Sequence, residues 1–383
     1  MYESSVIEIS RTALVNNLRF LKLRTGSGVK FCSVVKGNAY GHGLTEYISL
    51  AMECNQHYFG VYSADEAYKI VEYFEKPPEI YIMGMVDNSA VEWAVRNRIE
   101  CCIFDMQRLE LAVKYAKKLK MKAKIHIELE TGMHRTGFEK KDIEKIAAWI
   151  KKHTKYIELV GVCTHFAGAE SMANNFRIIN QIENFNHQLL HISEMGLNPA
   201  YKHAACSAAF INYPETIGNM VRIGIMQYGY WPNEETFIRF NGQKERNSKY
   251  LKRLITWKSK VMSVKFVQKG EFIGYGTSYL AHRNMKIAVV PVGYAHGYSR
   301  NLSNNGHVLV KGIKVKVVGI VNMNAISIDV TNIDDIEKGE EVVLIGTQKN
   351  KSVSVVSFSE LSNQMNYEML TRLPKDIPRV IVE

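Results

Sequence analysis

The stretch FCSVVKGNAYGHG (31–43) decides the fold, because a run typical of a buried strand stops at a lysine and continues into small residues. Lys36 ends the run, and Gly37, Gly41 and Gly43 follow it. A lysine at a strand end is commonly solvated, but an amine in a partly desolvated pocket has a lowered pKa and can act as a nucleophile. These residues alone leave both interpretations of Lys36 open.

Stretches rich in Val, Ile, Phe and Tyr recur through the first two-thirds of the chain, at 31–35, 58–63, 79–84, 100–105, 123–130, 157–166, 200–207 and 220–229. Amphipathic helical stretches separate them, at 45–54, 64–74, 107–120, 141–152 and near 171–195. Apolar strands that alternate with helices favour a parallel sheet, and eight of them predict a (β/α)8 barrel of the TIM type. A doubly wound sheet is the alternative, but no glycine fingerprint opens the first helix.

The pattern changes after about residue 240, where strand-like stretches follow one another with Gly, Asn and Asp between them, at 258–267, 285–293, 307–321, 325–330, 340–346 and 351–358. One helical stretch follows at 359–366, and the polar segment 233–249 separates the two patterns. We therefore expect a barrel over 11–240 and a mainly-β domain over 241–383, with 1–10 as a candidate addition to the second domain.

Composition excludes several classes of protein. The chain has no run of eighteen apolar residues, and MYESSVIEIS (1–10) lacks the apolar core of a signal peptide. The six cysteines form no CxxC pair, which favours free thiols in the cytoplasm. The formal charge is +11, but the basic stretch 114–124 lacks interleaved aromatic residues and is typical of a solvated helix end. We expect a cytoplasmic protein with no nucleic-acid or membrane partner.

Reactive and polar residues gather where the predicted barrel strands end, and these ends form the active-site face of such a barrel. They are Lys36, ETGMHR (130–135), His165, Ser207 and Arg222 with Gly224. Ser207 begins a short helical stretch of small residues, and a helix N-terminus favours a phosphate group. A plain serine cap explains the same residue, so this signal alone does not decide. The histidines show no recognised zinc spacing, and no metal is predicted.

An ordered set of motifs then resembles the alanine racemase family, pyridoxal-phosphate enzymes with an N-terminal (β/α)8 barrel and a C-terminal β domain. The resemblance covers nearly the whole chain. The motifs are VVKGNAYGHG (34–43), ETGMHRTGF (130–138), GVCTHFAGAE (161–170), HAACSAA (203–209), VRIGI (221–225), GYGTSY (274–279), VGYAHGYSR (292–300), VNMNAISIDV (321–330) and NYEMLTRL (366–373).

The resemblance implies how the cofactor, pyridoxal 5'-phosphate, would be held. Lys36 matches the lysine that carries it covalently, and Arg222 matches the arginine that faces its pyridine nitrogen. An arginine keeps its proton at ordinary pH, so that nitrogen would stay unprotonated, which disfavours a decarboxylase. The positions that match phosphate-binding residues are Tyr40, Ser207, Gly224, Ile225 and Tyr367.

The resemblance also implies two bases, one on each face of the substrate Cα. Lys36 would serve one face, and Tyr275 of the partner subunit would serve the other, so a homodimer with composite active sites is implied. A tyrosine has an ordinary pKa of about 10, which is high for a base near neutral pH. Positive charge transmitted from Arg222 through His165 to Tyr275 would lower the pKa of this tyrosine. The positions that match substrate-binding residues are Arg135, Met323 and Tyr294.

Four positions depart from the family pattern. Glu128 stands where the family often has a carbamylated lysine, and we expect its carboxylate to pair with Arg135 directly or through water. Cys206 replaces the usual asparagine, and Asn324 and His296 replace acids, which affects substrate range. The resemblance favours a racemase of alanine. The alternatives are a racemase of other amino acids, such as serine or basic residues, and a non-catalytic pyridoxal-phosphate-binding protein.

Overall fold

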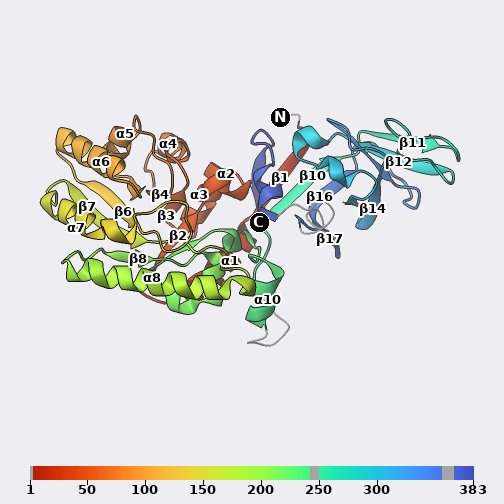
Figure 1. Cartoon of the computed structure of the whole chain (residues 1–383). Helices are drawn as coiled ribbons and strands as arrows, with labels where there is room; N and C mark the ends of the chain where they lie inside the picture. Colours follow the sequence, from red (N-terminus) through yellow and green to blue (C-terminus); the bar gives the residue numbers. More distant parts are fainter. Residues whose placement is uncertain (1–2, 242–249, 356–365) are drawn as a thin grey trace. The chain divides into compact units, whose positions relative to one another are not determined.

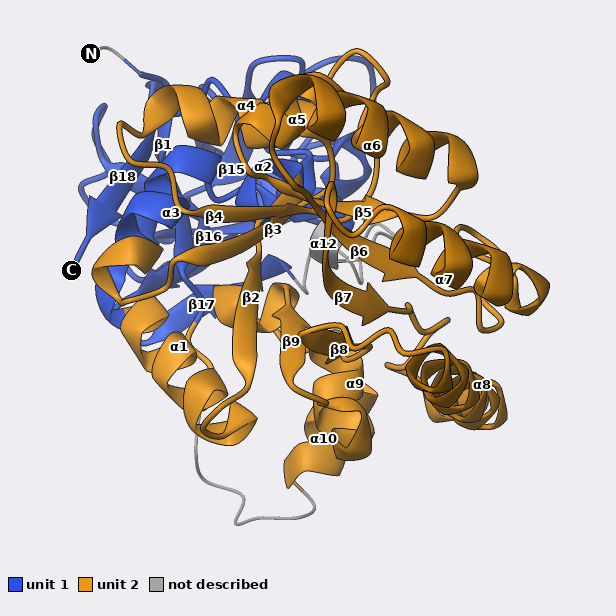
Figure 2. Cartoon of the chain, turned by 90° about the vertical axis from the view of Figure 1, so that its left-hand side faces the viewer, with its two compact units in different colours: residues 1–12, 37–50, 253–383 blue, residues 13–36, 51–252 orange. Residues whose placement is uncertain are grey.

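The structure is a computed structural model that describes residues 3–241, 250–355 and 366–383 (Figure 1). The chain divides into two compact units, drawn in different colours in Figure 2. Residues 13–36 and 51–252 form one unit, and residues 1–12, 37–50 and 253–383 form the other. The described part contains no helix that is long and apolar enough to cross a membrane.

Eight parallel strands form the core of the first unit, paired in the order β8-β7-β6-β5-β4-β3-β2-β9. The two end strands meet where Arg222 N donates to Ala205 O at 3.0 Å and where residues 206 and 222 form a parallel bridge. The predicted (β/α)8 barrel is therefore confirmed. The strands are β2 (Lys30–Val34), β3 (Tyr58–Val61), β4 (Glu79–Ile82), β5 (Glu100–Ile103), β6 (Ala123–Glu128), β7 (Ile157–Cys163), β8 (Tyr201–His203) and β9 (Met220–Ile223).

Amphipathic helices surround this sheet in Figure 2. Helix α6 shows why they form, since Asp105 caps its first turn by accepting from Arg108 N at 2.8 Å, and its apolar face is buried at Leu109, Ala112, Val113 and Ala116. The helices of this unit that follow the strands along the chain are α4 (Ala64–Tyr73), α5 (Val91–Arg96), α6 (Met106–Leu119), α7 (Ile143–Lys152), α8 (Asn175–Glu194), α9 (Ser207–Asn212) and α10 (Glu234–Asn241). Helix α3 (Leu44–Glu53) follows β2 along the chain, and its residues 44–50 belong to the second unit.

Several predicted elements differ from the observed ones. Helices α1 (Arg11–Thr25) and α5 lie outside the predicted helical stretches, because α1 is rich in polar residues and α5 has only six residues. The predicted strand 220–229 is strand only over β9, since its apolar remainder folds into the buried 3-10 helix η4 (Ile225–Tyr228). The polar segment 233–249 contains helix α10, and its residues 242–249 lie outside the described part.

The second unit is built on a mostly antiparallel sheet in the order β11-β12-β15-β14-β13-β16-β10-β1-β18, with β17 paired to β16. This confirms the mainly-β C-terminal fold, although β1 comes from the start of the chain and pairs in parallel with β18. The strands are β1 (Ser5–Ser10), β10 (Ile255–Lys260), β11 (Ser263–Val267), β12 (Met285–Val290), β13 (His307–Val310), β14 (Ile313–Val318), β15 (Ile326–Asp329), β16 (Glu341–Gln348), β17 (Lys351–Val353) and β18 (Arg379–Val382).

Two predictions at the end of the chain fall largely on residues that the structure does not describe. The predicted strand 351–358 is β17 over its first three residues, and 356–358 lie outside the described part. The predicted helix 359–366 also lies outside it, except for Asn366, where helix α12 (Asn366–Thr371) begins.

The backbone after Lys36 forms a left-handed turn in α2 (Lys36–Tyr40), with φ values of 64° at Gly37, 57° at Asn38, 52° at Ala39 and 51° at Tyr40. Each non-glycine residue in this conformation costs roughly 1–2 kcal/mol. Surrounding contacts must therefore hold the turn in place.

His42 holds this turn from within. Its Nδ1 donates to Ala39 O at 3.1 Å and to Tyr40 O at 3.0 Å, and Leu44 N donates to Asn38 Oδ1 at 3.0 Å. Burial lowers the pKa of His42 from 6.5 to about 4, so the imidazole is neutral in the folded chain at neutral pH. A neutral ring can donate from Nδ1 without carrying a buried charge.

This buried histidine predicts a pH-dependent stability. Between pH 6.5 and about 4 the unfolded chain binds a proton at His42 that the folded chain excludes, so stability falls as the pH falls, by at most about 1.4 kcal/mol per pH unit. Chemical denaturation of the wild type and of His42→Asn at pH 7 and pH 4.5 should show the smaller acid loss in the variant. The control variant His57→Asn, at an exposed position, should lose as much stability as the wild type. An equal loss between pH 7 and pH 4.5 in His42→Asn and in the wild type would contradict the role assigned to His42.

Candidate active site

The carboxyl ends of the barrel strands bring together the residues singled out in the first unit. Lys36 follows β2, Arg135 lies in the loop after β6, and His165 follows β7. Ser207 begins α9 after β8, and Arg222 belongs to β9. Parallel strands of a barrel end on the same face, so one mouth carries all five side chains.

Lys36 has the electrostatic environment of a reactive amine. Its pKa is lowered, first by the surrounding protein, which desolvates the ammonium form, and then by the positive charge of Arg135. Arg222 acts in the same direction, whereas Glu66 partly opposes the shift. The side chain is nevertheless exposed, so a small molecule can reach the amine. A larger fraction of neutral, nucleophilic amine follows from this combination.

Arg222 is buried, and backbone carbonyls surround its guanidinium. Nη2 donates to Thr164 O at 2.7 Å and to Ala204 O at 3.1 Å, and Nη1 donates to His203 O at 2.9 Å. Nη1 also contacts His203 Nδ1. Four contacts fix the plane of a side chain that cannot lose its proton at ordinary pH.

His165 is a neutral residue at this mouth. Burial, followed by the positive charges of Arg222, Arg135 and Lys36 in that order, lowers its pKa to about 3. The hydrogen bonds of Arg222 go to other groups in the described structure. The expected positive charge on His165 is therefore not supported, because burial first, and then the nearby positive charges, keep the imidazole unprotonated.

A small polar cradle lies at the starts of two short helices. Ser207 Oγ accepts from Gly224 N at 2.9 Å, and η4 begins at the next residue, Ile225. Cys206 precedes the serine and provides no side-chain cap for α9. The serine hydroxyl and backbone N–H groups at a helix start are groups that bind phosphate oxygens. These residues and the amine of Lys36 therefore fit a phosphate-bearing aldehyde such as pyridoxal phosphate.

Glu130 organises the loop that carries Arg135. Its Oε1 accepts from Gly132 N and from Met133 N, the latter at 2.8 Å, and its Oε2 accepts from His134 N at 2.8 Å. A carboxylate that accepts several backbone hydrogen bonds pins the chain around it. The residues that set the position of Arg135 therefore include Glu130.

The expected direct pair between Glu128 and Arg135 is absent from the described ion pairs. Glu128 Oε2 instead accepts from Thr136 Oγ1 at 2.8 Å. Burial raises the pKa of Glu128, and the charge of Arg135 opposes this rise, so the two residues interact through space.

The remaining predicted residues belong to the second unit. Tyr275 lies between β11 and β12 with 72% of its surface exposed. Tyr294 and Met323 are 42% and 55% exposed, and they lie on adjoining segments, since Tyr294 N donates to Asn322 O at 3.0 Å and Ala295 N donates to Met323 O at 3.0 Å.

The two phosphate-binding tyrosines predicted for this unit are described to different extents. Tyr40 is half-buried at the end of the left-handed turn. Tyr367 lies in α12, and its side chain lies outside what the structure describes.

The departure at His296 has a structural explanation. Gly293 N donates to His296 Nδ1 at 3.2 Å, so the imidazole accepts at the start of η5 (Tyr294–His296) as a carboxylate would. A Cβ on Gly293 would collide with the carbonyl oxygens of Asn322 and Met323, which explains the glycine. Asn324 is exposed beside them.

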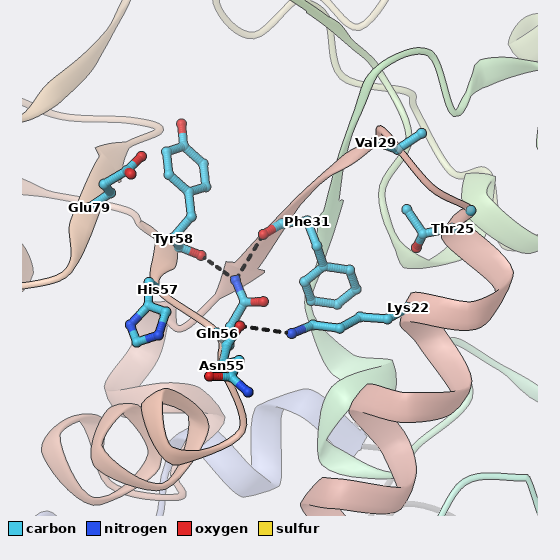
Figure 3. Close-up of a pocket in the computed structure, with 10 residues that line it drawn as sticks. Lys22, Thr25, Val29, Phe31, Asn55, Gln56, His57, Tyr58 and Glu79 are labelled. Carbon is cyan, nitrogen blue, oxygen red and sulfur yellow. Dashed lines mark hydrogen bonds between the residues drawn. The ribbon is translucent and has the colours of Figure 1, made fainter.

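A pocket of about 370 Å³ opens at the other end of the barrel (Figure 3). Its lining includes Lys22, Gln56, Tyr58 and Glu79, which lie at or before the amino ends of β2, β3 and β4. That face of a TIM-type barrel contributes stability rather than catalysis.

Within residues 3–241, 250–355 and 366–383, no group of three His, Cys, Asp or Glu side chains is arranged to hold a metal ion.

The sequence reasoning missed three residues behind the mouth: Glu100, His126 and His203. They are buried polar side chains on strands β5, β6 and β8, and His126 lies between two isoleucines in the run AKIHIELE (123–130). A polar residue inside a strand that is predicted to be buried could have indicated this network, since a buried polar group needs a hydrogen-bonding partner.

Comparisons with known proteins identify the family of this chain. Residues 9–232 match the family described as alanine racemase, N-terminal domain, and residues 254–381 match alanine racemase, C-terminal domain. Alanine racemase of Leptospira interrogans is 32% identical over 380 residues, which cover 99% of this chain and 96% of the relative.

Solved structures extend the likeness to the whole fold. Alanine racemase of Clostridium difficile superposes with a TM-score of 0.90 at 30% identity, covering 100% of this chain and 96% of that one. The Bacillus anthracis enzyme, solved with bound L-Ala-P, gives 0.89 at 29% identity with the same coverage. The chain belongs to the alanine racemase family, whose members are pyridoxal-phosphate-dependent isomerases.

The contacts of Glu130 lead to a prediction for the loop after β6. Glu130→Ala leaves three backbone N–H groups without their charged acceptor, at a cost of about 1.5–3 kcal/mol each. Hydrogen exchange read by mass spectrometry should show peptides covering 132–134 exchanging at least about tenfold faster. The exposed Glu139→Ala is the matched control, and unchanged exchange in Glu130→Ala would show that the carboxylate does not hold the loop.

Proposed function

We propose that this chain interconverts L- and D-alanine with pyridoxal phosphate held on Lys36. The observation that carries the proposal is the position of this lysine. Lys36 has a lowered pKa, and it lies at the same barrel mouth as Arg222 and the Ser207–Gly224 cradle. Membership of the alanine racemase family over both of its domains supports the same activity.

Each barrel residue has a definite task in this proposal. The cofactor, when bound, supplies an electron sink for breaking the Cα–H bond of an amino acid. Ser207 and the N–H groups of Gly224 and Ile225 bind its phosphate, with Tyr40 and Tyr367 as further phosphate ligands. Arg222 donates to its ring nitrogen and keeps its own proton.

Two groups move the proton of the substrate. The amine of Lys36 takes or returns it on one face of Cα, and the phenol oxygen of Tyr275 of the partner subunit does so on the other. The exposure of Tyr275 on the β unit, at 72%, leaves it available to another molecule. Neutral His165 supports Tyr275 by hydrogen bonding rather than by positive charge, as its pKa of about 3 requires. The active form is therefore a homodimer with composite sites.

The substrate is an amino acid held by its carboxylate. Arg135 and the backbone N–H of Met323 bind this group, and Tyr294 lines the access route. Alanine is favoured because the curated relatives carry that name. Serine or a basic amino acid is the alternative substrate, and a non-catalytic pyridoxal-phosphate-binding protein is the alternative function.

The setting and the domain limits follow from the same sequence features. All six cysteines are free in the structure, which supports a reducing cytoplasmic compartment. We place the barrel domain at 11–240 and the β domain at 241–383, with 1–10 joining the second.

A labelling experiment tests the cofactor and the substrate together. Borohydride reduction of the holoenzyme, followed by peptide mapping, should leave the cofactor on Lys36, while Lys36→Arg should carry none. The wild type in D2O should remove the α-proton NMR signal of L-alanine faster than that of L-serine or L-lysine. A cofactor fixed elsewhere would overturn the assignment of Lys36, and a bound cofactor without any exchange would favour the non-catalytic alternative.

Mixed dimers test the composite site. Lys36→Ala and Tyr275→Phe homodimers should each be nearly inactive, whereas a heterodimer joins an intact Lys36 to an intact Tyr275 at one of its two sites. Random reassortment of equal amounts should therefore restore about a quarter of the wild-type activity. No recovery, with heterodimers verified by mass spectrometry, would place both residues of a site in one subunit.

A further inference from the structure

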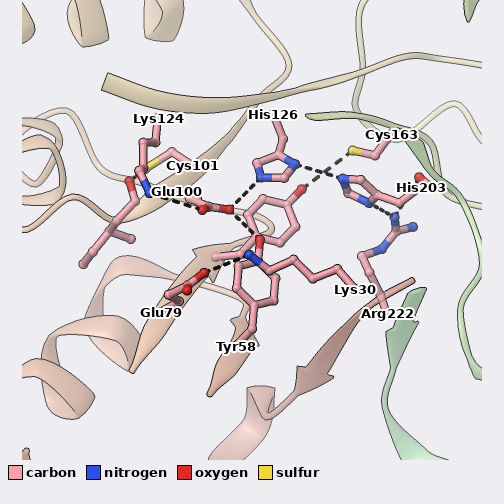
Figure 4. A network of polar contacts seen from close by, with 12 residues as sticks. Lys30, Tyr58, Glu79, Glu100, Cys101, Lys124, His126, Cys163, His203 and Arg222 are labelled. Atoms are coloured by element: carbon pink, nitrogen blue, oxygen red, sulfur yellow. Dashed lines mark hydrogen bonds and ion pairs between the residues drawn. The ribbon is translucent and has the colours of Figure 1, made fainter. Parts of the chain in front are cut away.

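A chain of polar side chains crosses the interior of the barrel behind the active site (Figure 4). Arg222 Nη1 contacts His203 Nδ1, His203 Nε2 lies 2.9 Å from His126 Nδ1, and His126 Nε2 lies 2.9 Å from Glu100 Oε2. Both histidines are fully buried. The chain therefore links the mouth at β9, through β8 and β6, to the amino end of β5.

The two ends of this chain impose one direction on every hydrogen bond. Arg222 can only donate, so His203 Nδ1 accepts and the proton of His203 lies on Nε2. That proton is donated to His126 Nδ1, which places the proton of His126 on Nε2, facing Glu100. A carboxylate can only accept, so the far end requires the same arrangement. A proton added to either histidine would set two donors against each other.

The charges around the chain agree with this arrangement. Burial, followed by the charge of Arg222, lowers the pKa of His203, and burial also lowers the pKa of His126, so both rings are neutral. The pKa of Glu100 is lowered despite its burial, because His126 and Tyr58 donate to it. Tyr58 OH donates to the same Oε2 at 2.5 Å, outside the path to Arg222.

We propose that Glu100 and His126 are remote positioning residues of the racemase, which fix the tautomer of His203 and through it the orientation of Arg222. The inference rests on the proposed function for its catalytic consequence. Neither residue reaches the mouth, and both act through hydrogen bonds. Glu100 supplies the fixed acceptor at one end, and its negative charge balances the buried guanidinium along a polarised chain.

The chain of hydrogen bonds gives the buried guanidinium of Arg222 a counter-charge at a distance. A buried guanidinium without a counter-charge is costly, but a carboxylate in direct contact would hold the plane of Arg222 away from the cofactor nitrogen. Two neutral imidazoles carry the influence of the anion over the width of the barrel. Lys124 Nζ, 3.7 Å from Glu100 Oε1, lies at that far end and helps to keep the carboxylate ionised.

The tautomers themselves are measurable. In holoenzyme labelled with 15N-histidine, long-range 1H–15N correlation spectra distinguish a protonated ring nitrogen from an unprotonated one. His126 and His203, assigned with His126→Gln and His203→Gln, should both carry the proton on Nε2 and should not titrate between pH 6 and pH 9. A proton on Nδ1 of either ring, or a doubly protonated ring at pH 7, would overturn the proposal.

Variants at Glu100 test the consequence for catalysis. Glu100→Leu removes the acceptor, and we expect kcat to fall at least about tenfold with KM changed less than about twofold, together with mixed tautomers at His126. Glu100→Gln keeps an acceptor oxygen and should restore the single tautomer and most of kcat. Tyr58→Phe removes the other hydrogen bond to the same oxygen and should match the wild type in kcat and tautomers.

The two readouts separate the two proposals. Unchanged kcat and unchanged tautomers in folded Glu100→Leu, or an equal loss in Tyr58→Phe, would show that the chain serves stability alone. Wild-type protein with the expected tautomers but without racemase activity would refute the proposed function. The proposed direction of the hydrogen bonds from Arg222 to Glu100 would still be supported. The tautomer result does not depend on racemase activity.

Discussion

The active site depends on one buried positive charge, the guanidinium of Arg222. Backbone carbonyls of Thr164, His203 and Ala204 surround it at 2.7–3.1 Å, so it stays fixed at the carboxyl end of the barrel. Its field reaches the neighbouring titratable groups, where it contributes to the lowered pKa values of Lys36 and His165. The lowered pKa of the Lys36 amine and the neutral imidazole of His165 follow first from burial, and then from this charge together with that of Arg135.

A second constraint is the strained backbone that follows Lys36. Four consecutive residues adopt a left-handed conformation, and the chain supports them with contacts from distant parts of the sequence. Arg379 Nη2 donates to Gly41 O at 3.0 Å, and a Cβ on Gly41 would collide with the carbonyl oxygen of Leu370. The cost of the turn is therefore offset within the second unit, by residues more than three hundred positions further along.

The departures from the family pattern are accommodated differently. His296 accepts a hydrogen bond from Gly293 N at the position of an acid, so the start of η5 keeps this contact without a negative charge. Glu128 is held by Thr136 and does not pair directly with Arg135, whose loop is held by Glu130. Each of these segments therefore keeps its hydrogen bonds with a side chain of different charge.

The barrel and the β sheet could be predicted from the sequence because hydrophobic periodicity and strand spacing are local properties. The same is true of Lys36, Ser207 and Arg222, which stand at strand ends that the pattern predicts. The 3-10 helix η4 could not be predicted, since its apolar residues suit a buried strand equally well and only packing separates the two. The sequence by itself thus determined the architecture and the residues at the barrel mouth.

Tertiary structure alone decided how those residues are connected. The path Arg222–His203–His126–Glu100 joins residues up to 122 positions apart, counted from Glu100 to Arg222, through side chains on four different strands. No local pattern encodes such a path, because each contact exists only after the sheet has closed. The direction of its hydrogen bonds is set by a cation at one end and an anion at the other, and the barrel is what brings the two ends into one chain.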